Sequence, residues 1–126
     1  MTFALGALEH ATGSVVDSGG PLVPFAMIEV DGNMSLTRFV GELAEGQQKA
    51  REAISASTGV TRAAVAWDGY LTLDGQRTDA VFVEASAIGD LESVVLAQRY
   101  EIAGRRRKRV QAIDIAALIS RQQPLF

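Results

Sequence analysis

The sequence predicts an α+β fold with a mainly antiparallel sheet of about five to six strands and two helices. Three observations lead to this prediction. Apolar residues recur at helical spacing in two segments, β-rich segments occupy most of the remainder, and Asp-Gly pairs stand between neighbouring β-rich segments. Because the connections between expected strands are short except where the second helix intervenes, neighbouring strands should pair antiparallel. Both helices are expected on one face of the sheet.

Length and composition predict a single domain, residues 1–126. Of the 126 residues, 48% are hydrophobic and 21% are charged, which is enough apolar material for one core. The chain has no cysteine and one histidine, so disulfides, thiolate zinc sites and cysteine nucleophiles are excluded. It has no apolar run long enough to span a membrane. We therefore expect a soluble, cytoplasmic protein without membrane, metal or cofactor partners.

The first half of the chain predicts a helix, a hairpin and a second helix. Residues 4–16 place Leu5, Leu8, Ala11, Val15 and Val16 near one helical face. Segments 22–30 and 34–40 are β-rich and are joined by Asp31-Gly32-Asn33, a strong hairpin signal. Residues 42–57 form the second helix, with one apolar face and a charged opposite side that includes Arg51.

A second hairpin has a predictable register. Segments 61–73 and 77–86 flank Asp74-Gly75, and a two-residue type I′ turn there pairs residues whose numbers sum to 149. Trp67 then faces Phe82. The expected core face carries Ala63, Val65, Trp67, Leu71, Leu73, Ala80 and Phe82. The expected polar face carries Arg62, Asp68, Tyr70, Thr72, Arg77, Asp79, Val81 and Val83.

The C-terminal part predicts one strand and leaves two alternatives for the tail. A strand is expected over about residues 92–102, after which Gly104 and the basic run that follows it turn the chain. Residues 109–115 return as a fourth strand, or Asp114 caps a short helix that continues through Ile119.

Three stretches of the chain resemble a known family. They read AWDGYLTLDGQRTDA (66–80), VEA (83–85) and AQRY (97–100), and they cover about the central third of the sequence. They resemble a family of small bacterial proteins of unassigned function. The resemblance implies a bacterial origin and brings no activity with it.

The polar face of the second hairpin is the best candidate ligand site. Carboxylates, a phenol and guanidinium groups within a few strand spacings can bind a polar ligand. Gln98 and Tyr100 are further groups that the next strand can add. The simpler alternative is a solvated sheet face with cross-strand pairs, and a third is a dimer contact. The candidate residues are Asp68, Tyr70, Arg77, Asp79, Glu84 and Arg99.

Two other features have simpler explanations than function. The basic run holds five of the twelve basic residues and can contact phosphates, but a charged loop that blunts a sheet edge is the commoner arrangement. The net charge of −3 argues against nucleic acid as a partner. His10 is expected to be a surface or interface residue, although Ser14 follows one turn later on the same helix. The run consists of Arg105, Arg106, Arg107, Lys108 and Arg109.

The sequence shows no nucleophile, base or metal-ligand constellation, so no catalytic residues are assigned. The leading hypothesis is a non-enzymatic binding or regulatory module that acts as a homodimer, because sheet edges need cover. One alternative is a small-molecule receptor or enzyme that uses the polar face of hairpin 61–86. Another is nucleic-acid binding through the run 105–109.

Overall fold

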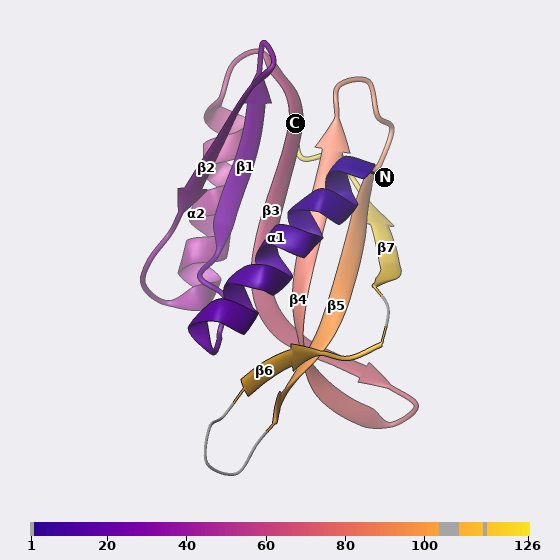
Figure 1. Ribbon diagram of the computed structural model, residues 1–126. Coiled ribbons are helices and arrows are strands. Elements are labelled where there is room, and N and C mark those ends of the chain that lie inside the picture. Colours follow the sequence, from indigo (N-terminus) through magenta and orange to yellow (C-terminus); the bar gives the residue numbers. More distant parts are fainter. Residues whose placement is uncertain (1, 104–108, 115) are drawn as a thin grey trace.

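The computed structural model in Figure 1 describes residues 2–103, 109–114 and 116–126. Within this part of the chain, two helices accompany one seven-stranded antiparallel sheet, which confirms the predicted α+β class and element order. In chain order the elements are α1 (Thr2–Ser18), β1 (Phe25–Val30), β2 (Asn33–Arg38), α2 (Leu43–Ala56), β3 (Val60–Leu73), β4 (Gln76–Ala87), β5 (Ser93–Ala103), β6 (Arg109–Ala112) and β7 (Ala117–Gln122).

The strands lie in the order β2-β1-β3-β4-β5, and both β6 and β7 pair with β5. β6 lies beside Tyr100–Ala103, whereas β7 lies beside Ser93–Ala97. Two short strands, β6 and β7, therefore share the outer edge of β5. The opposite edge of the sheet is β2.

Both hairpin turns form where Asp-Gly pairs predict them. Asp74 and Gly75 have φ values of 51° and 76°, the left-handed conformation that a type I′ turn requires. The pairs run from Arg62 opposite Ala87 to Leu73 opposite Gln76, so the predicted register is confirmed throughout. In the first hairpin the turn is Asp31-Gly32, and Asn33 already belongs to β2.

The helices pack on opposite faces of the sheet, so the expectation that they share one face is wrong. The buried residues of α1 cluster with Ala64 and Val83, whereas Ile54 of α2 clusters with Ala63 and Val65. Successive residues of β3 point to opposite faces, and here both sets are apolar. Val81 and Val83, expected on the polar face, have no exposed surface because α1 covers them. Figure 1 shows α1 crossing the face turned to the viewer, with α2 behind β1 and β2.

Helix α1 contacts the sheet through small residues. Its buried face is Ala4, Ala7, Leu8, Ala11 and Val15, which retains only part of the predicted face. Leu5 and Val16 are 40% and 43% exposed. Neither helix in the described part of the chain is long and apolar enough to cross a membrane.

The tail is a strand, and the alternative of a final helix through Ile119 is wrong. Residues 117–122 pair with β5 along Ser93–Ala97 as β7. The predicted fourth strand is present as β6, and Ile115 at the end of that prediction lies outside the described residues. A strand forms here because the outer edge of β5 offers unpaired backbone groups beyond the end of β6.

Candidate functional site

Four of the six predicted ligand residues lie together on the face that α1 covers, beyond the end of the helix. Asp68, Tyr70, Arg77 and Asp79 occupy one face of the β3–β4 hairpin, where Tyr70 is paired with Asp79. The Arg77 guanidinium lies over the Tyr70 ring at 3.9 Å from its centroid. An open hollow of about 600 Å³ beside them is lined by Tyr70, Arg77, Thr78, Asp79, Tyr100, Glu101 and Ile102.

Asp68 holds a loop in place. Its Oδ2 accepts a hydrogen bond of 2.8 Å from the backbone N–H of Leu22, and the Tyr100 hydroxyl donates to the same carboxylate at 2.8 Å. Tyr100 thus joins the polar group, as the sequence allowed. Its hydroxyl, however, occupies the Asp68 carboxylate oxygen that a ligand would otherwise contact. Asp68 therefore ties the segment before β1 to β3 and β5.

Burial perturbs both members of this pair. Desolvation raises the pKa of Asp68 above its ordinary value, and the Asp79 carboxylate adds to the rise, whereas the hydrogen bonds from Leu22 and Tyr100 oppose it. Desolvation and the Asp68 carboxylate raise the pKa of Tyr100 as well. Near neutral pH the phenol therefore stays protonated and acts as a donor to Asp68.

Glu84 and Arg99 do not belong to this polar group. Glu84 is two residues from Phe82 on β4, so its side chain points to the same face of the sheet as Phe82. Arg99 is paired with Ala80, which also lies on that face. This is the face opposite to the one that carries Asp68. The sequence-based grouping of these two residues with Asp68 is therefore wrong. The reason is the strict alternation of side chains along a strand, together with a β4–β5 register that no local turn rule fixes.

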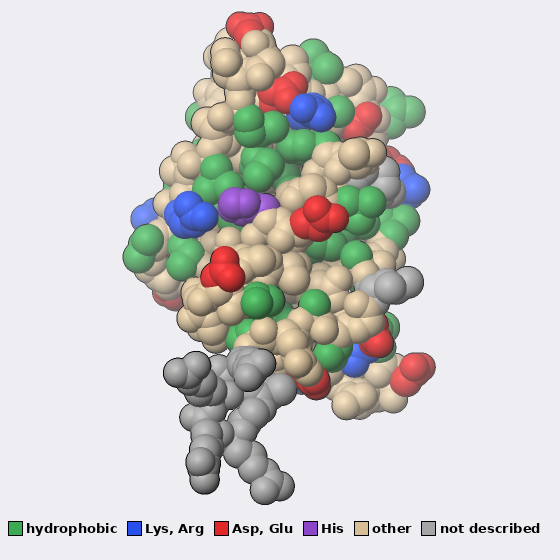
Figure 2. Space-filling view, in the orientation of Figure 1, with side chains coloured by type: hydrophobic (Ala, Val, Ile, Leu, Met, Phe, Trp, Pro, Cys, Tyr) green, Lys and Arg blue, Asp and Glu red, His purple; other side chains and the backbone are tan. Residues whose placement is uncertain are grey.

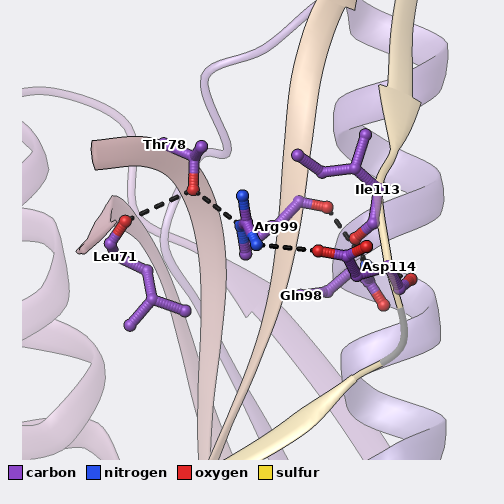
Figure 3. Close-up of polar contacts among 6 residues, drawn as sticks. All are labelled: Leu71, Thr78, Gln98, Arg99, Ile113 and Asp114. Carbon is purple, nitrogen blue, oxygen red and sulfur yellow. Dashed lines mark hydrogen bonds and ion pairs between the residues drawn. The ribbon is translucent and has the colours of Figure 1, made fainter. Parts of the chain in front are cut away.

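Arg99 clamps the connection between β6 and β7, as Figure 3 shows. Its Nε donates to Thr78 Oγ1 at 2.9 Å, and its Nη1 lies 2.7 Å from Asp114 Oδ2. The neighbouring Gln98 amide donates to the carbonyl of Ile113 at 2.8 Å and therefore does not join the Asp68 group. These contacts attach the segment between β6 and β7 to the edge of β5.

Glu84 is the most deeply buried charged residue among those described, with 4% of its surface exposed. Its Oε1 lies 2.8 Å from Nη1 of Arg51, which reaches over from α2. Its Oε2 accepts a 2.7 Å hydrogen bond from the buried Ser93 hydroxyl. Both carboxylate oxygens therefore have partners, as a buried charge requires.

An aromatic pair lies beside this ion pair. The Trp67 and Phe82 rings are stacked with centroids 5.6 Å apart and planes 9° apart. The Arg51 guanidinium lies over Trp67, 5.3 Å from the ring centroid. A Cβ on Gly69 would lie 3.1 Å from the Phe82 ring, so glycine at this position leaves room for the ring.

These groups line a hollow of about 720 Å³ that we call the α2–β7 hollow. It arises because α2 packs over β1 and β3 on this face. β7 extends the sheet beside β5, and Leu125, which follows β7, packs against the cluster under α2. The face of β4 and β5 between α2 and β7 has no helix over it. The lining residues are Arg51, Trp67, Phe82, Glu84, Val95, Ile119, Ser120, Gln122 and Gln123.

The sequence places Trp67 and Phe82 in the core, and the structure confirms this, because Phe82 is 8% exposed and Trp67 packs against two buried clusters. The sequence does not predict the role of Arg51, which it places on the solvent side of its helix and which the structure pairs with Glu84. One signal was available, because the register places Glu84 opposite Val65 on an apolar face. A carboxylate in such a position requires a cationic partner, and the facing helix is where that partner is found.

His10 and the basic run carry no site in the described structure. His10 is exposed and its ring meets the edge of the buried Phe25 ring, 5.5 Å away between centroids. The Ser14 hydroxyl donates to the His10 backbone carbonyl rather than to the imidazole. Residues 105–108 lie outside the described part of the chain, and Arg109 begins β6. On the α1 side, Figure 2 shows basic and acidic side chains interspersed across the coloured surface.

Within residues 2–103, 109–114 and 116–126, no group of three or more His, Asp or Glu side chains is placed to hold a metal ion. No protein-family model matches the chain, and neither a curated protein nor a solved structure matches it. The resemblance of residues 66–100 to small bacterial proteins therefore stays a prediction.

Proposed function

We propose that this protein is a non-enzymatic binding module that holds a small molecule in the α2–β7 hollow. One observation carries the proposal: an ion pair between the partly exposed Arg51 and the buried Glu84 borders a stacked aromatic pair in an open hollow of about 720 Å³. Ligand sites commonly combine an apolar lining with a few fixed polar groups. The hairpin hollow fits less well, because the Tyr70 ring in its lining is 62% exposed and so offers little apolar surface fixed by packing.

The chemistry around the hollow favours binding over catalysis. Ser93 is the hydroxyl nearest to a carboxylate, but it has no exposed surface and its oxygen also lies 3.1 Å from the Gln123 carbonyl oxygen. A serine nucleophile needs access to substrate and an oxyanion site beside it. His10, the only histidine in the chain, is on α1 across the sheet.

A thermal-shift screen of the full chain against small metabolites tests the proposal. A ligand at about one hundred times its Kd stabilises by about 2.7 kcal/mol, which raises Tm by several degrees. We expect a hit whose effect is lost in Arg51→Gln and kept in the matched variant Arg77→Gln on the other face. The reverse pattern would place the site at the hairpin, and a blank screen would overturn small-molecule binding.

We also propose that the protein forms a homodimer through β2. This strand is the open edge of the sheet, pairs with β1 without a register shift, and exposes five of its six residues. The other edge is divided between four-residue β6 and β7, whose pairing contains an irregularity. Short and bulged edges resist further pairing, whereas a regular edge invites it. A two-fold contact of β2 with its copy would close that edge.

Sedimentation of the wild type and of Met34→Lys tests this second proposal. Met34 is 44% exposed on β2, and a lysine on an edge strand opposes pairing. We expect the dimer to dissociate in this variant and to persist in Leu91→Lys, a control at a loop residue that is 91% exposed. A wild type that is monomeric at high concentration would contradict the proposal, as would a dimer unaffected by Met34→Lys.

A further inference from the structure

We propose that the ligand of the α2–β7 hollow is a flat aromatic compound that carries a single carboxylate. This inference rests on the function proposed above and names the class of molecule that the hollow recognises. Three properties of the hollow lead to it: the donors of Arg51, the aromatic lining and the balance of charge.

Arg51 supplies the group that binds the carboxylate. A guanidinium has five N–H donors in a planar fork that matches two carboxylate oxygens. Within the part of the chain that the structure describes, Glu84 is the only carboxylate at ion-pair distance from Arg51, and it meets Nη1. Further donors of the guanidinium therefore remain for a ligand in the hollow that this residue lines.

Glu84 and Trp67 hold the guanidinium in position before a ligand arrives. Glu84 is fixed by Ser93 on its other oxygen, and the Trp67 ring lies beneath the guanidinium. A side chain that is already ordered loses less conformational entropy when it binds. Arg51 is about one-third exposed, with 32% of its side-chain surface accessible, so an anion can reach it from the hollow.

The apolar part of the hollow is suited to a ring. The partly buried Trp67 ring lines the hollow and is stacked with the Phe82 ring, which is 8% exposed. The largely buried Val95 and the 38% exposed Ile119 add aliphatic surface. Aromatic rings pack favourably in offset-stacked or edge-to-face arrangements at such sites. The remaining lining groups, Ser120, Gln122 and Gln123, are neutral hydrogen-bonding residues that tolerate a planar ligand with polar substituents.

The charge balance selects a monoanion. Arg51 and Glu84 are the only charged residues of the lining, and their charges cancel. A cationic ligand would have to displace Arg51 from Glu84. A dianion such as a phosphate monoester would place a second negative charge close to the buried carboxylate, where repulsion is strong. A single carboxylate gains the Arg51 hydrogen bonds with the least repulsion.

Titrations monitored by Trp67 fluorescence test the ligand class. Trp67 is the single tryptophan of the chain and lines the hollow. The probes are benzoate and phenylacetate, their neutral amides benzamide and phenylacetamide, and the cation benzylamine. We expect at least one acid to bind about tenfold or more tightly than its amide, since a charge-assisted hydrogen bond contributes more than a neutral one.

Variants assign the effect to Arg51. In Arg51→Gln the affinity for the acid should fall to that for its amide, and the affinity for the amide should stay as it is in the wild type. Because this variant leaves Glu84 without its partner, the double variant Arg51→Gln/Glu84→Gln removes the buried charge and should show the same loss. Arg77→Gln on the other face should bind as the wild type does.

The outcomes separate the two proposals. If neither acid binds, or if the amide or benzylamine binds as tightly as the acid, the ligand class is overturned. A metabolite hit that depends on Arg51 would still support the binding function in that case. If the metabolite screen also gives no such hit, the binding function itself is overturned.

Discussion

At the scale of single residues, the two faces of the sheet use charge differently. Asp68 is half-buried within β3, opposite Val81 of β4, and is stabilised by neutral donors from Leu22 and Tyr100. Glu84 is buried on the other face and is paired with the cationic Arg51. Titration of Asp68 should therefore make the stability of the fold depend on pH. At Glu84, stability should instead depend on the presence of Arg51.

The Arg51–Glu84 pair should show strong coupling in a double-mutant cycle. Arg51→Met leaves a buried carboxylate uncompensated and should cost about 2 kcal/mol of unfolding free energy. The double variant Arg51→Met/Glu84→Met removes both charges and should be more stable than Arg51→Met alone. Urea denaturation of the wild type, both single variants and the double variant measures the coupling. Additive effects would contradict a buried, interacting pair.

Asp68 should make stability increase toward acid relative to Asp68→Asn. Because its folded pKa is raised above the ordinary value of 3.8, the folded state takes up the proton before the unfolded state does as pH falls. The wild type should therefore gain unfolding free energy relative to Asp68→Asn between neutral pH and that value. Urea denaturation across this range measures the difference. A difference that stays constant or falls toward acid would contradict the raised pKa.

At the scale of elements, the turns are the parts most completely determined by local sequence. Both Asp-Gly pairs adopt positive φ at two consecutive residues, and each fixes the register of a hairpin. The helix faces are determined less locally. In α1 the buried face combines three alanines with Leu8 and Val15, and Leu5 and Val16 lie outside this stripe of the helix.

Replacing glycine by alanine should have opposite effects in a turn and in a helix. Gly75 has φ of 76°, so Gly75→Ala should cost about 1 kcal/mol through backbone strain. Gly13 lies in α1, and a Cβ there meets no atom within 4 Å, so Gly13→Ala should stabilise by about 0.5–1 kcal/mol. Thermal unfolding of the two variants measures both signs. Equal signs would contradict this account of either position.

At the scale of the whole molecule, the sheet is the shared layer between two cores. The cluster under α1 and the cluster under α2 draw on alternate residues of the same β3 strand. A substitution that destabilises one cluster should therefore also destabilise the other, because both pack on the same strand. On the α2 face, β4 and β5 carry a third buried cluster, formed by Ala80, Phe82, Val95 and Ala97, and the α2–β7 hollow lies beside it.

Leu8→Ala in α1 should weaken the whole molecule in one transition. Leu8 is 2% exposed, and its truncation should cost about 2–4 kcal/mol. Trp67 lies on the opposite face, so its fluorescence and the far-UV circular dichroism should shift to the same lower denaturant midpoint. The exposed Leu5→Ala serves as the control and should change stability by less than about 0.5 kcal/mol. Separate midpoints for the two signals would contradict the prediction of a single domain.

The sequence by itself determined the fold class, the order of the elements and the register of the β3–β4 hairpin. These follow from periodicity and turn chemistry, which act over a few residues. Only the tertiary structure decided which face each helix covers, that Tyr100 meets Asp68, and that Arg51 reaches Glu84. These contacts join residues 32 and 33 positions apart in the chain, and no local rule relates residues at that separation. They depend on how apolar surface on both faces of the sheet is buried, which is a property of the assembled molecule.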